Sequence, residues 1–256
     1  MIVHAIATHR VTATDRDLMA ILDTYLPSFE ERSVLVVTSK IAAITQGRLV
    51  PVEQADKLDL IREEAEYYLP PDENRYHVAL TIKNSAVIPN AGIDESNGNG
   101  HYILWPEQPY TVANEVCAYL RARFSRRDVG VVITDSHTTP LRWGVTGFAI
   151  AYSGFDPLKN YVGETDIFGR RLVYTKVNVA DALAASAVLV MGEGNEQTPL
   201  AVVSDLDFVA FWDRATPPQD VQEMRIDLDT DLYGPLLKRV TWRIGGAYQA
   251  TGRSRE

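Results

Sequence analysis

This sequence has only one cysteine, no long apolar run and no excess of basic residues. The 256 residues include one cysteine, Cys117, which excludes a disulfide framework and any zinc site built from several cysteines. Lone free cysteines are usually buried, so we expect Cys117 to be a small core residue. The 25 Lys and Arg against 34 Asp and Glu give a net charge of −9, which argues against nucleic acid as a partner.

The apolar segments are short. The longest runs, Val34–Val37 and Val188–Met191, are far below the length that crosses a bilayer. The first residues also lack the basic stretch and sustained apolar stretch that are typical of a signal peptide. We therefore expect a cytoplasmic protein with no membrane partner.

Common catalytic and nucleotide-binding motifs are absent as well. The chain has no GxxxxGK[ST] phosphate loop, no GxGxxG fingerprint, no HExxH and no GxSxG. A nucleotide bound here would therefore be bound by a less common fold.

What is present is an ordinary globular composition, 46% hydrophobic and 23% charged, with mixed periodicity. Short apolar runs predict strands at 33–39, 77–82, 102–105, 129–134 and 200–204. Helical spacing predicts helices over 55–69, from Pro109 to Phe124 and over 179–191, and a capping box of Thr14 and Asp17 predicts a fourth from Leu18. The mixture favours an α+β fold, with mixed sheets and flanking helices.

Three polar segments follow apolar ones, and we expect them to be loops: Asn90–Asn97, Asp135–Arg142 and Gly192–Pro199. Each offers a carboxylate beside small residues. Asp94, Asp135 and Glu193 are the oxygen ligands that Mg²⁺ or Mn²⁺ would take beside a phosphate. When each segment is taken alone, ordinary turn formation is the better explanation.

Other polar residues near these segments have two interpretations each. His137 lies in an Asp-Ser-His string, but the partners of a catalytic triad meet in space, so a structural role is expected. Arg142 and Lys40 could meet phosphate or carboxylate groups, whereas a single base is more often solvated. Trp143 either stacks on a ligand ring or, as we expect, fills the core.

The ordered strings over residues 30–205 resemble the coenzyme F420-0:L-glutamate ligase family, also called gamma-glutamyl ligases. The strings are VVTSK (Val36–Lys40) with Gly47-Arg48, NAGIDESN (Asn90–Asn97), ITDS (Ile133–Ser136), PLRWG (Pro140–Gly144), DIFGR (Asp166–Arg170) and ADALAASAVLVMGEGNEQTP (Ala180–Pro199). Because these motifs cover most of the chain, we expect one catalytic unit over residues 1–256, with two interleaved lobes as a variant of it.

The resemblance implies a gamma-glutamyl ligase-like fold, a homodimer, and dependence on Mg²⁺ or Mn²⁺ and on GTP (or ATP). It implies a ligase that forms an amide between L-glutamate and an acceptor carboxylate through an acyl phosphate. The acceptor would be a deazaflavin coenzyme precursor, a folate or another small carboxylate. The DSHTTPLRWGVTG string looks like a bacterial branch that is associated with folate metabolism.

Site residues follow from the resemblance motif by motif. It implies metal ligands at Asp94, Asp135, Ser136 and Glu193, and catalytic roles for Asp135 and Arg142. It implies nucleotide contacts at Ser39, Lys40, Asn97, Gly192, Gly194, Asn195 and Thr198.

The chain also departs from the family pattern in three places. Asp135–Pro140 reads Asp-Ser-His-Thr-Thr-Pro where members commonly have Asp-Thr-x-Gly-Arg-Pro. Ile44 replaces a lysine, and Thr8–Val11 replaces a Leu-Pro-Leu-Ile string. The same carboxylates would also serve a metal-dependent phosphohydrolase, or a nucleotide-binding module without turnover, and these two functions remain alternatives.

Overall fold

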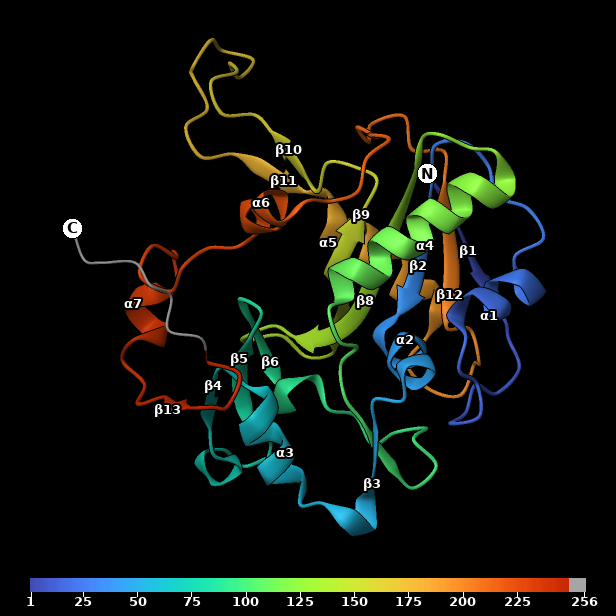
Figure 1. Cartoon of the computed structure of the whole chain (residues 1–256). Helices are drawn as coiled ribbons and strands as arrows, with labels where there is room; N and C mark the ends of the chain where they lie inside the picture. Colours follow the sequence, from blue (N-terminus) through green and yellow to red (C-terminus); the bar gives the residue numbers. More distant parts are fainter. Residues whose placement is uncertain (249–256) are drawn as a thin grey trace. The chain divides into compact units, whose positions relative to one another are not determined.

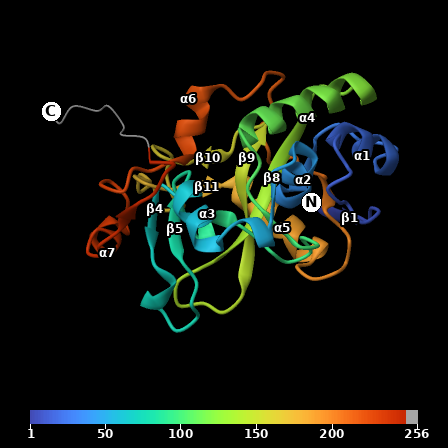
Figure 2. The same cartoon turned by 60° about the horizontal axis from the view of Figure 1, so that its bottom comes forward.

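The computed structural model describes residues 1–248, and the chain divides into two compact units (Figures 1 and 2). The first unit comprises Met1–Arg48 and Pro106–Met224. The second comprises Leu49–Trp105 and, among the described residues, 225–248. Whether the two interleaved units form one catalytic unit stays a prediction.

The first unit is built on a five-stranded sheet with the order β1-β12-β2-β8-β9. Its strands are β1 (Ile2–Ile6), β12 (Leu200–Ser204), β2 (Ser33–Thr38), β8 (Val129–Thr138) and β9 (Val145–Ser153). Strands β2 and β8 pair in parallel, and every other pair is antiparallel. The expected α+β class is therefore confirmed.

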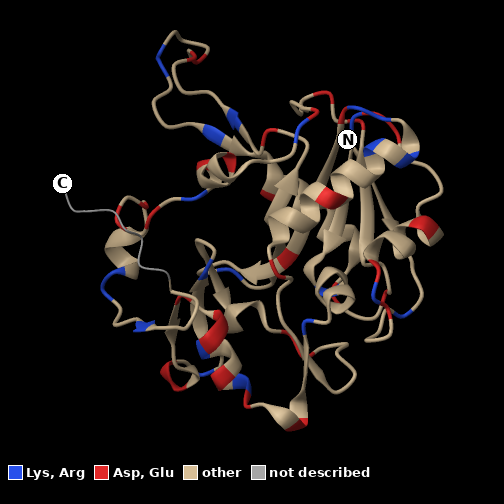
Figure 3. Ribbon diagram, in the orientation of Figure 1, with Lys and Arg blue, Asp and Glu red and all other residues tan. Residues whose placement is uncertain are grey.

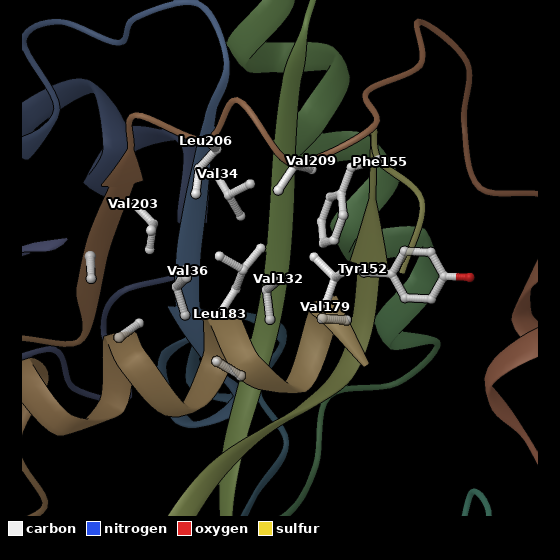
Figure 4. Close-up of a cluster of buried hydrophobic side chains, with 14 of the residues drawn as sticks. Val34, Val36, Val132, Tyr152, Phe155, Val179, Leu183, Val203, Leu206 and Val209 are labelled. Atoms are coloured by element: carbon white, nitrogen blue, oxygen red, sulfur yellow. The ribbon is translucent and has the colours of Figure 1, made fainter. Parts of the chain in front are cut away.

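Two long helices cover the two faces of this sheet. Helix α5 (Val179–Met191) packs against one face and α4 (Pro109–Phe124) lies across the other (Figures 1 and 2). Because both faces are covered, β2 and the first half of β8 are continuously apolar rather than alternating. Figure 4 shows the core on the α5 side, which contains Val34, Val36, Val132, Leu183 and Val203.

The rest of the first unit consists of short elements. They are α1 (Leu18–Tyr25), α2 (Ser39–Gln46), α6 (Pro218–Val221), a 3-10 turn (Gln222–Met224) and a β-hairpin of β10 (Leu158–Asn160) and β11 (Lys176–Asn178). The free thiol of Cys117 is buried in α4, as expected, and burial raises its pKa.

The second unit contains a four-stranded antiparallel sheet with the order β13-β4-β5-β6. Its strands are β13 (Arg243–Ile244), β4 (Tyr67–Leu69), β5 (Leu80–Lys83) and β6 (Ala86–Pro89); a separate pair joins β3 (Leu49–Pro51) to β7 (His101–Ile103). The helices are α3 (Lys57–Glu64) and α7 (Gly234–Leu237), with 3-10 turns at Val52–Gln54, Pro71–Glu73 and Asn90–Gly92.

Some predicted elements need correction. The helix expected over 55–69 ends at Glu64, because Tyr67–Leu69 pairs with β5 as a strand. The N-cap of α1 is Asp17 itself, whose side chain accepts from the N–H groups of Met19 and Ala20, so the capping box with Thr14 is wrong. Helices α4 and α5 have the expected bounds. Among residues 1–248, no helix combines the length and the apolarity that crossing a membrane requires.

Candidate functional site

Strand β8 carries two of the candidate residues. The segment Asp135–Arg142 was expected to be a loop, but Asp135–Thr138 continue β8 and pair with β9. The register of this pair shifts between Ile133 and Thr134, where the apolar part of the strand gives way to the polar part. A register shift changes the local twist and the direction of the side chains that follow. It therefore sets the orientation of Asp135 and Ser136.

Ser136 and Glu193 meet, although they lie far apart in the sequence. The Ser136 hydroxyl donates to Glu193 Oε2 over 3.3 Å, and the Ser136 N–H donates to Asp135 Oδ1 over 2.8 Å. Helix α5 ends at Met191, two residues before Glu193, and thereby brings this carboxylate beside the end of β8. Two of the three predicted carboxylates thus share one region of the first unit.

The loop from Gly192 to Pro199 is folded around a carboxylate of its own. Glu196 Oε2 accepts the N–H of Gly194 over 2.8 Å. The Thr198 hydroxyl donates to the Met191 carbonyl and closes the loop at its base. Gly192 has φ +81°, and a Cβ there would lie 2.5 Å from the Glu196 carboxyl carbon. The Gly194 N–H of this loop therefore already binds a carboxylate, that of Glu196.

The predicted Ser39-Lys40 pair lies next to this loop. Thr38, which caps α2 directly before Ser39, donates its N–H to the Pro199 carbonyl over 3.0 Å. On the other side, the Thr8 N–H donates to the Gln197 carbonyl over 2.9 Å. The structure thus brings together three segments. The resemblance implies nucleotide contacts in two of them, Ser39-Lys40 and the Gly192–Pro199 loop, and the third, Thr8–Val11, departs from the family pattern.

His137 has a structural environment. Its ring packs on Phe148, with 4.7 Å between the ring centroids, whereas the hydroxyl of its neighbour Ser136 faces Glu193. Burial lowers the pKa of His137 and raises that of Asp181 in α5. The charge of Asp181 acts to raise the pKa of His137, and the charge of His137 acts to lower the pKa of Asp181, so each opposes the effect of burial. The Asp-Ser-His string is therefore no relay between sequence neighbours.

Arg142 and Trp143 lie at the tip of the β8–β9 hairpin, and both are exposed. The expectation that Trp143 fills the core is wrong, because its side chain is 88% exposed. An exposed indole beside a guanidinium is available for stacking on a ligand ring, the alternative interpretation of the sequence.

Asp94 and Asn97 belong to the second unit. Ser96 donates to Asp94 twice, from its N–H to Oδ1 over 2.7 Å and from its hydroxyl to Oδ2 over 2.9 Å. The backbone of Asp94 exchanges two hydrogen bonds with Ile103 of β7, which fixes its position. Asn97 has a left-handed backbone with φ +58° in the turn that follows.

The donors of the first unit suit a hard cation. Asp135, Ser136 and Glu193 present carboxylate and hydroxyl oxygens, which Mg²⁺ and Mn²⁺ prefer, and Asp94 presents a carboxylate of the same kind within the second unit. Within residues 1–248, no group of three or more His, Cys, Asp and Glu side chains is arranged to hold a metal ion. Mg²⁺ commonly takes only one or two carboxylates and completes its shell with water and substrate phosphate, as the Ser136–Glu193 pair would allow.

Sequence reasoning missed two groups at these sites. Glu196 lies within the GEGNE string, but only its contacts distinguish it from Glu193 as the residue that fills the loop. The buried side chain of Lys83 contacts the carbonyl of Ala91 in the Asn90–Gly92 turn before Asp94. A lysine at the end of a short strand gives no sign of burial in the sequence.

Known proteins are similar to this sequence over most of its length. Residues 5–205 match the profile of the family F420-0:Gamma-glutamyl ligase. The Coenzyme F420:L-glutamate ligase of Halobacterium salinarum is 35% identical over 217 residues, which cover 80% of this chain and 81% of that protein. The enzyme of the same name from Archaeoglobus fulgidus is 35% identical over 194 residues (70% and 78%), and that from Methanopyrus kandleri is 33% identical over 197 residues (69% and 76%).

The matched segment contains β8 and the α5–Glu193 junction of the first unit and the turn before Asp94 of the second, so the similarity covers each of these candidate segments. On this evidence the chain belongs to the F420-0:gamma-glutamyl ligase family, a family of ligases.

Proposed function

We propose that this protein is an amide-forming ligase that joins L-glutamate to a carboxylate of a coenzyme F420 precursor at the expense of GTP or ATP. The observation that carries the proposal is the meeting of Ser136 and Glu193 beside a loop whose backbone binds a carboxylate. A site of this kind suits a substrate with phosphate groups and a divalent cation. A folate or another small carboxylate is a second acceptor class for the same chemistry.

The reaction would proceed in two balanced steps. The acceptor carboxylate oxygen attacks the γ-phosphorus, and the bond to the nucleoside diphosphate breaks, leaving an acyl phosphate. The amine of glutamate then attacks the acyl carbon, the carbon–oxygen bond to phosphate breaks, and the amine loses its proton. A carboxylate is a poor electrophile, so phosphorylation supplies the leaving group that amide formation requires.

The chain's own residues bind and orient the reactants in this scheme. Asp135, Ser136 and Glu193 of the first unit would hold Mg²⁺ or Mn²⁺, with Asp94 of the second unit as a further proposed ligand, and the cation would neutralise charge on the transferring phosphoryl group. Ser39, Lys40, Asn97 and the loop residues Gly192, Gly194, Asn195 and Thr198 would bind the nucleotide, with the loop N–H groups on its phosphates after Glu196 moves aside. Arg142 would pair with a carboxylate of the acceptor or of glutamate.

The test is a product assay on the full chain. Purified protein is incubated with GTP or ATP, Mn²⁺, L-glutamate and either the F420 precursor or a folate, and products are weighed by mass spectrometry. We expect an acceptor that has gained a glutamyl residue, with one phosphate released per bond. Phosphate release without an amide product would instead establish a phosphohydrolase, and nucleotide binding without turnover a binding module.

The Asp135→Asn variant tests the site within the same assay. It should lose turnover by a factor of about 10³ or more, because it removes a charge from the phosphoryl-transfer site, while its circular dichroism spectrum and melting temperature stay close to those of the wild type. Unchanged turnover would contradict the assignment of Asp135.

We propose further that the protein is a homodimer, on the basis of the arm that spans residues 158–178. This arm is a hairpin that starts from β10 and β11, and its backbone bonds include Tyr161 to Thr175. Ile167, Phe168 and Tyr174 are 92%, 89% and 90% exposed there, which is typical of an interaction surface. Residues 158–178 contain four basic and two acidic residues, in a chain of net charge −9, and Figure 3 marks basic positions along the ribbon of the arm. Light scattering should give a dimer, and a monomer for Ile167→Ser combined with Phe168→Ser.

A further inference from the structure

The turn Asn90–Gly92, which precedes Asp94 in the second unit, has an unfavourable backbone. Asn90, Ala91 and Gly92 have φ values of +53°, +54° and +74°. Only glycine adopts this left-handed region without steric cost, and alanine has no side-chain polar group to compensate for it. Surrounding contacts must therefore hold the turn in this conformation.

Buried polar groups make some of these contacts. The Ala91 N–H donates to Thr81 Oγ1 over 2.9 Å, and that hydroxyl donates to the Ile88 carbonyl over 2.7 Å. The Asn90 side chain accepts the N–H of Ala79 over 3.1 Å. These bonds attach the first half of the turn to strands β5 and β6.

Lys83 contacts Ala91, the middle residue of the turn. Its ammonium group lies 2.6 Å from Glu64 Oε2, 3.4 Å from the Ala91 carbonyl oxygen and 5.1 Å from the centre of the Trp105 ring. Only 10% of the Lys83 side chain is exposed. Burying an ammonium and a carboxylate costs free energy that their mutual attraction often fails to repay. The pair is thus unlike a solvated surface ion pair. Its ammonium group donates a hydrogen bond to the Ala91 carbonyl of the strained turn.

Trp105 closes the other side of the turn. A Cβ added to Gly92 would lie 2.0 Å from Trp105 Nε1, so the indole packs directly on the glycine backbone. Lys83 in turn lies over the Trp105 ring, an arrangement that favours a cation over a neutral side chain. The ammonium therefore contacts both the carbonyl of Ala91 and the ring that covers Gly92.

We propose that Lys83, paired with Glu64, is a positioning residue for Asp94. It holds the turn Asn90–Gly92 in its left-handed conformation, and the turn fixes the entry of the chain into Asp94, whose backbone is bonded to Ile103. The inference rests on the proposed function, in which Asp94 is a ligand of the divalent cation. Lys83 itself acts on Asp94 through the backbone of the turn.

The experiment compares three variants of the full chain by two measurements. Lys83→Met keeps the length of the side chain but removes its charge and its N–H donors. Lys83→Met combined with Glu64→Met also removes the carboxylate that the single change would leave buried without its ammonium. Lys57→Met is the matched control, because Lys57 pairs with Glu95 at 3.4 Å, beside Asp94, yet these two side chains are 33% and 52% exposed, more than those of Lys83 and Glu64.

The first measurement is hydrogen exchange of the peptide that covers residues 90–94. Exchange should be about tenfold faster in Lys83→Met and in the double variant, as expected for the loss of a hydrogen bond to a charged group. It should be unchanged in Lys57→Met. This result depends on the turn alone and on no bound cation.

The second measurement is Mn²⁺ binding, followed by the electron paramagnetic resonance signal of the free ion. Affinity should fall by about 10 to 100-fold in Lys83→Met, the usual effect of removing a group that orients a ligand. The double variant should regain the melting temperature of the wild type without regaining Mn²⁺ affinity, which separates positioning from stability. If Lys83→Met fails to fold, the double variant carries both measurements.

The outcomes distinguish the two proposals. Unchanged exchange at 90–94 would overturn the role of Lys83, and so would a double variant in which Mn²⁺ affinity recovers along with stability. If the wild type binds no Mn²⁺, or Asp94→Asn leaves Mn²⁺ binding intact, the metal assignment in the proposed function fails. The exchange measurement then still decides whether Lys83 holds the turn.

Discussion

The loop Gly192–Pro199 in the first unit and the turn Asn90–Asp94 in the second each present a candidate metal carboxylate, but they are held in different ways. The loop is exposed, and its interior is filled by the flexible Glu196 side chain. The turn is bonded to buried Thr81 and Lys83 and covered by buried Trp105. One carboxylate is carried by an exposed segment and the other by a segment that buried side chains hold.

This difference suggests that the two segments serve different roles, phosphate binding by the loop and cation binding by the turn. A loop that binds phosphates must exchange Glu196 for the incoming anion, so some freedom is useful there. A ligand that fixes a cation gains from a rigid backbone, because less conformational freedom is lost when the cation binds. Substitutions at comparable positions of the two segments should therefore have unequal effects.

The largest effect is expected for Gly92→Ala. The new Cβ would meet the buried Trp105 ring, and the residue has φ +74°, so neither neighbour nor backbone can relax. We expect a loss of about 3 kcal/mol in the free energy of unfolding, measured by urea denaturation. Gly100→Ala is the control, because φ there is +81° with no atom within 4 Å of the added Cβ. Equal losses in both variants would show that Trp105 contributes nothing.

A smaller loss of stability is expected for Gly192→Ala. Its φ is +81°, but the atoms that a Cβ would meet belong to the end of the Glu196 side chain, which can swing into solvent. Because φ +81° with ψ 172° is a conformation that is essentially restricted to glycine, we expect a loss of about 2 kcal/mol in unfolding free energy, accompanied by a clear loss of nucleotide affinity in a fluorescence titration. Gly163→Ala, at φ +91° in the arm, should leave nucleotide affinity unchanged. A stability loss as large as that of Gly92→Ala would remove the contrast between the two segments.

The smallest effect concerns a support of the exposed loop. The hydrogen bond from the Thr12 N–H, and next the hydrogen bond from His9, hold the pKa of Asp15 below its usual 3.8. His9 directly follows Thr8, which contacts Gln197 of the loop. The folded protein thus binds fewer protons here than the unfolded chain, so this stabilisation is present above pH 3.8 and is lost as the pH falls through the folded pKa. Asp15→Asn should cost less than about 1 kcal/mol at pH 7.

Thermal unfolding across pH 2.5 to 7 checks this expectation. The difference between Asp15→Asn and the wild type should shrink toward the acid end of the range. A constant difference would mean that the side chain acts through packing and not through its charge.

Patterns of burial made part of this structure predictable. The unbroken apolar run of β2, the similar start of β8 and the helical spacing of α4 and α5 are visible because a core requires them. Residues 135–138 are polar, yet they belong to β8, because pairing with β9 supplies their backbone bonds. Tyr67–Leu69 fits a helical pattern equally well, and only its partner β5 makes it a strand.

The candidate site was predictable in its residues rather than in its supports. Motif resemblance singled out Asp135, Ser136 and Glu193, and the structure brings Ser136 to Glu193. Lys83 and Glu64 are 19 residues apart and lie among other charged residues, so nothing in the sequence marks them as a buried pair. The arm went unnoticed because its exposed Ile167 and Phe168 have the composition of a core segment.

The position of β12 in the first sheet also has a consequence for synthesis. β12 lies between β1 and β2 and pairs with both, and its residues follow β1 by almost the whole matched length of the chain. A ribosome that adds about 5 to 20 residues per second needs about 10 to 40 s to cover that distance. During this interval β1 has no neighbour in its sheet and β2 has an open edge. The nascent chain must therefore shield the open edges of β1 and β2 until β12, the last strand of this sheet to be synthesised, emerges to join them.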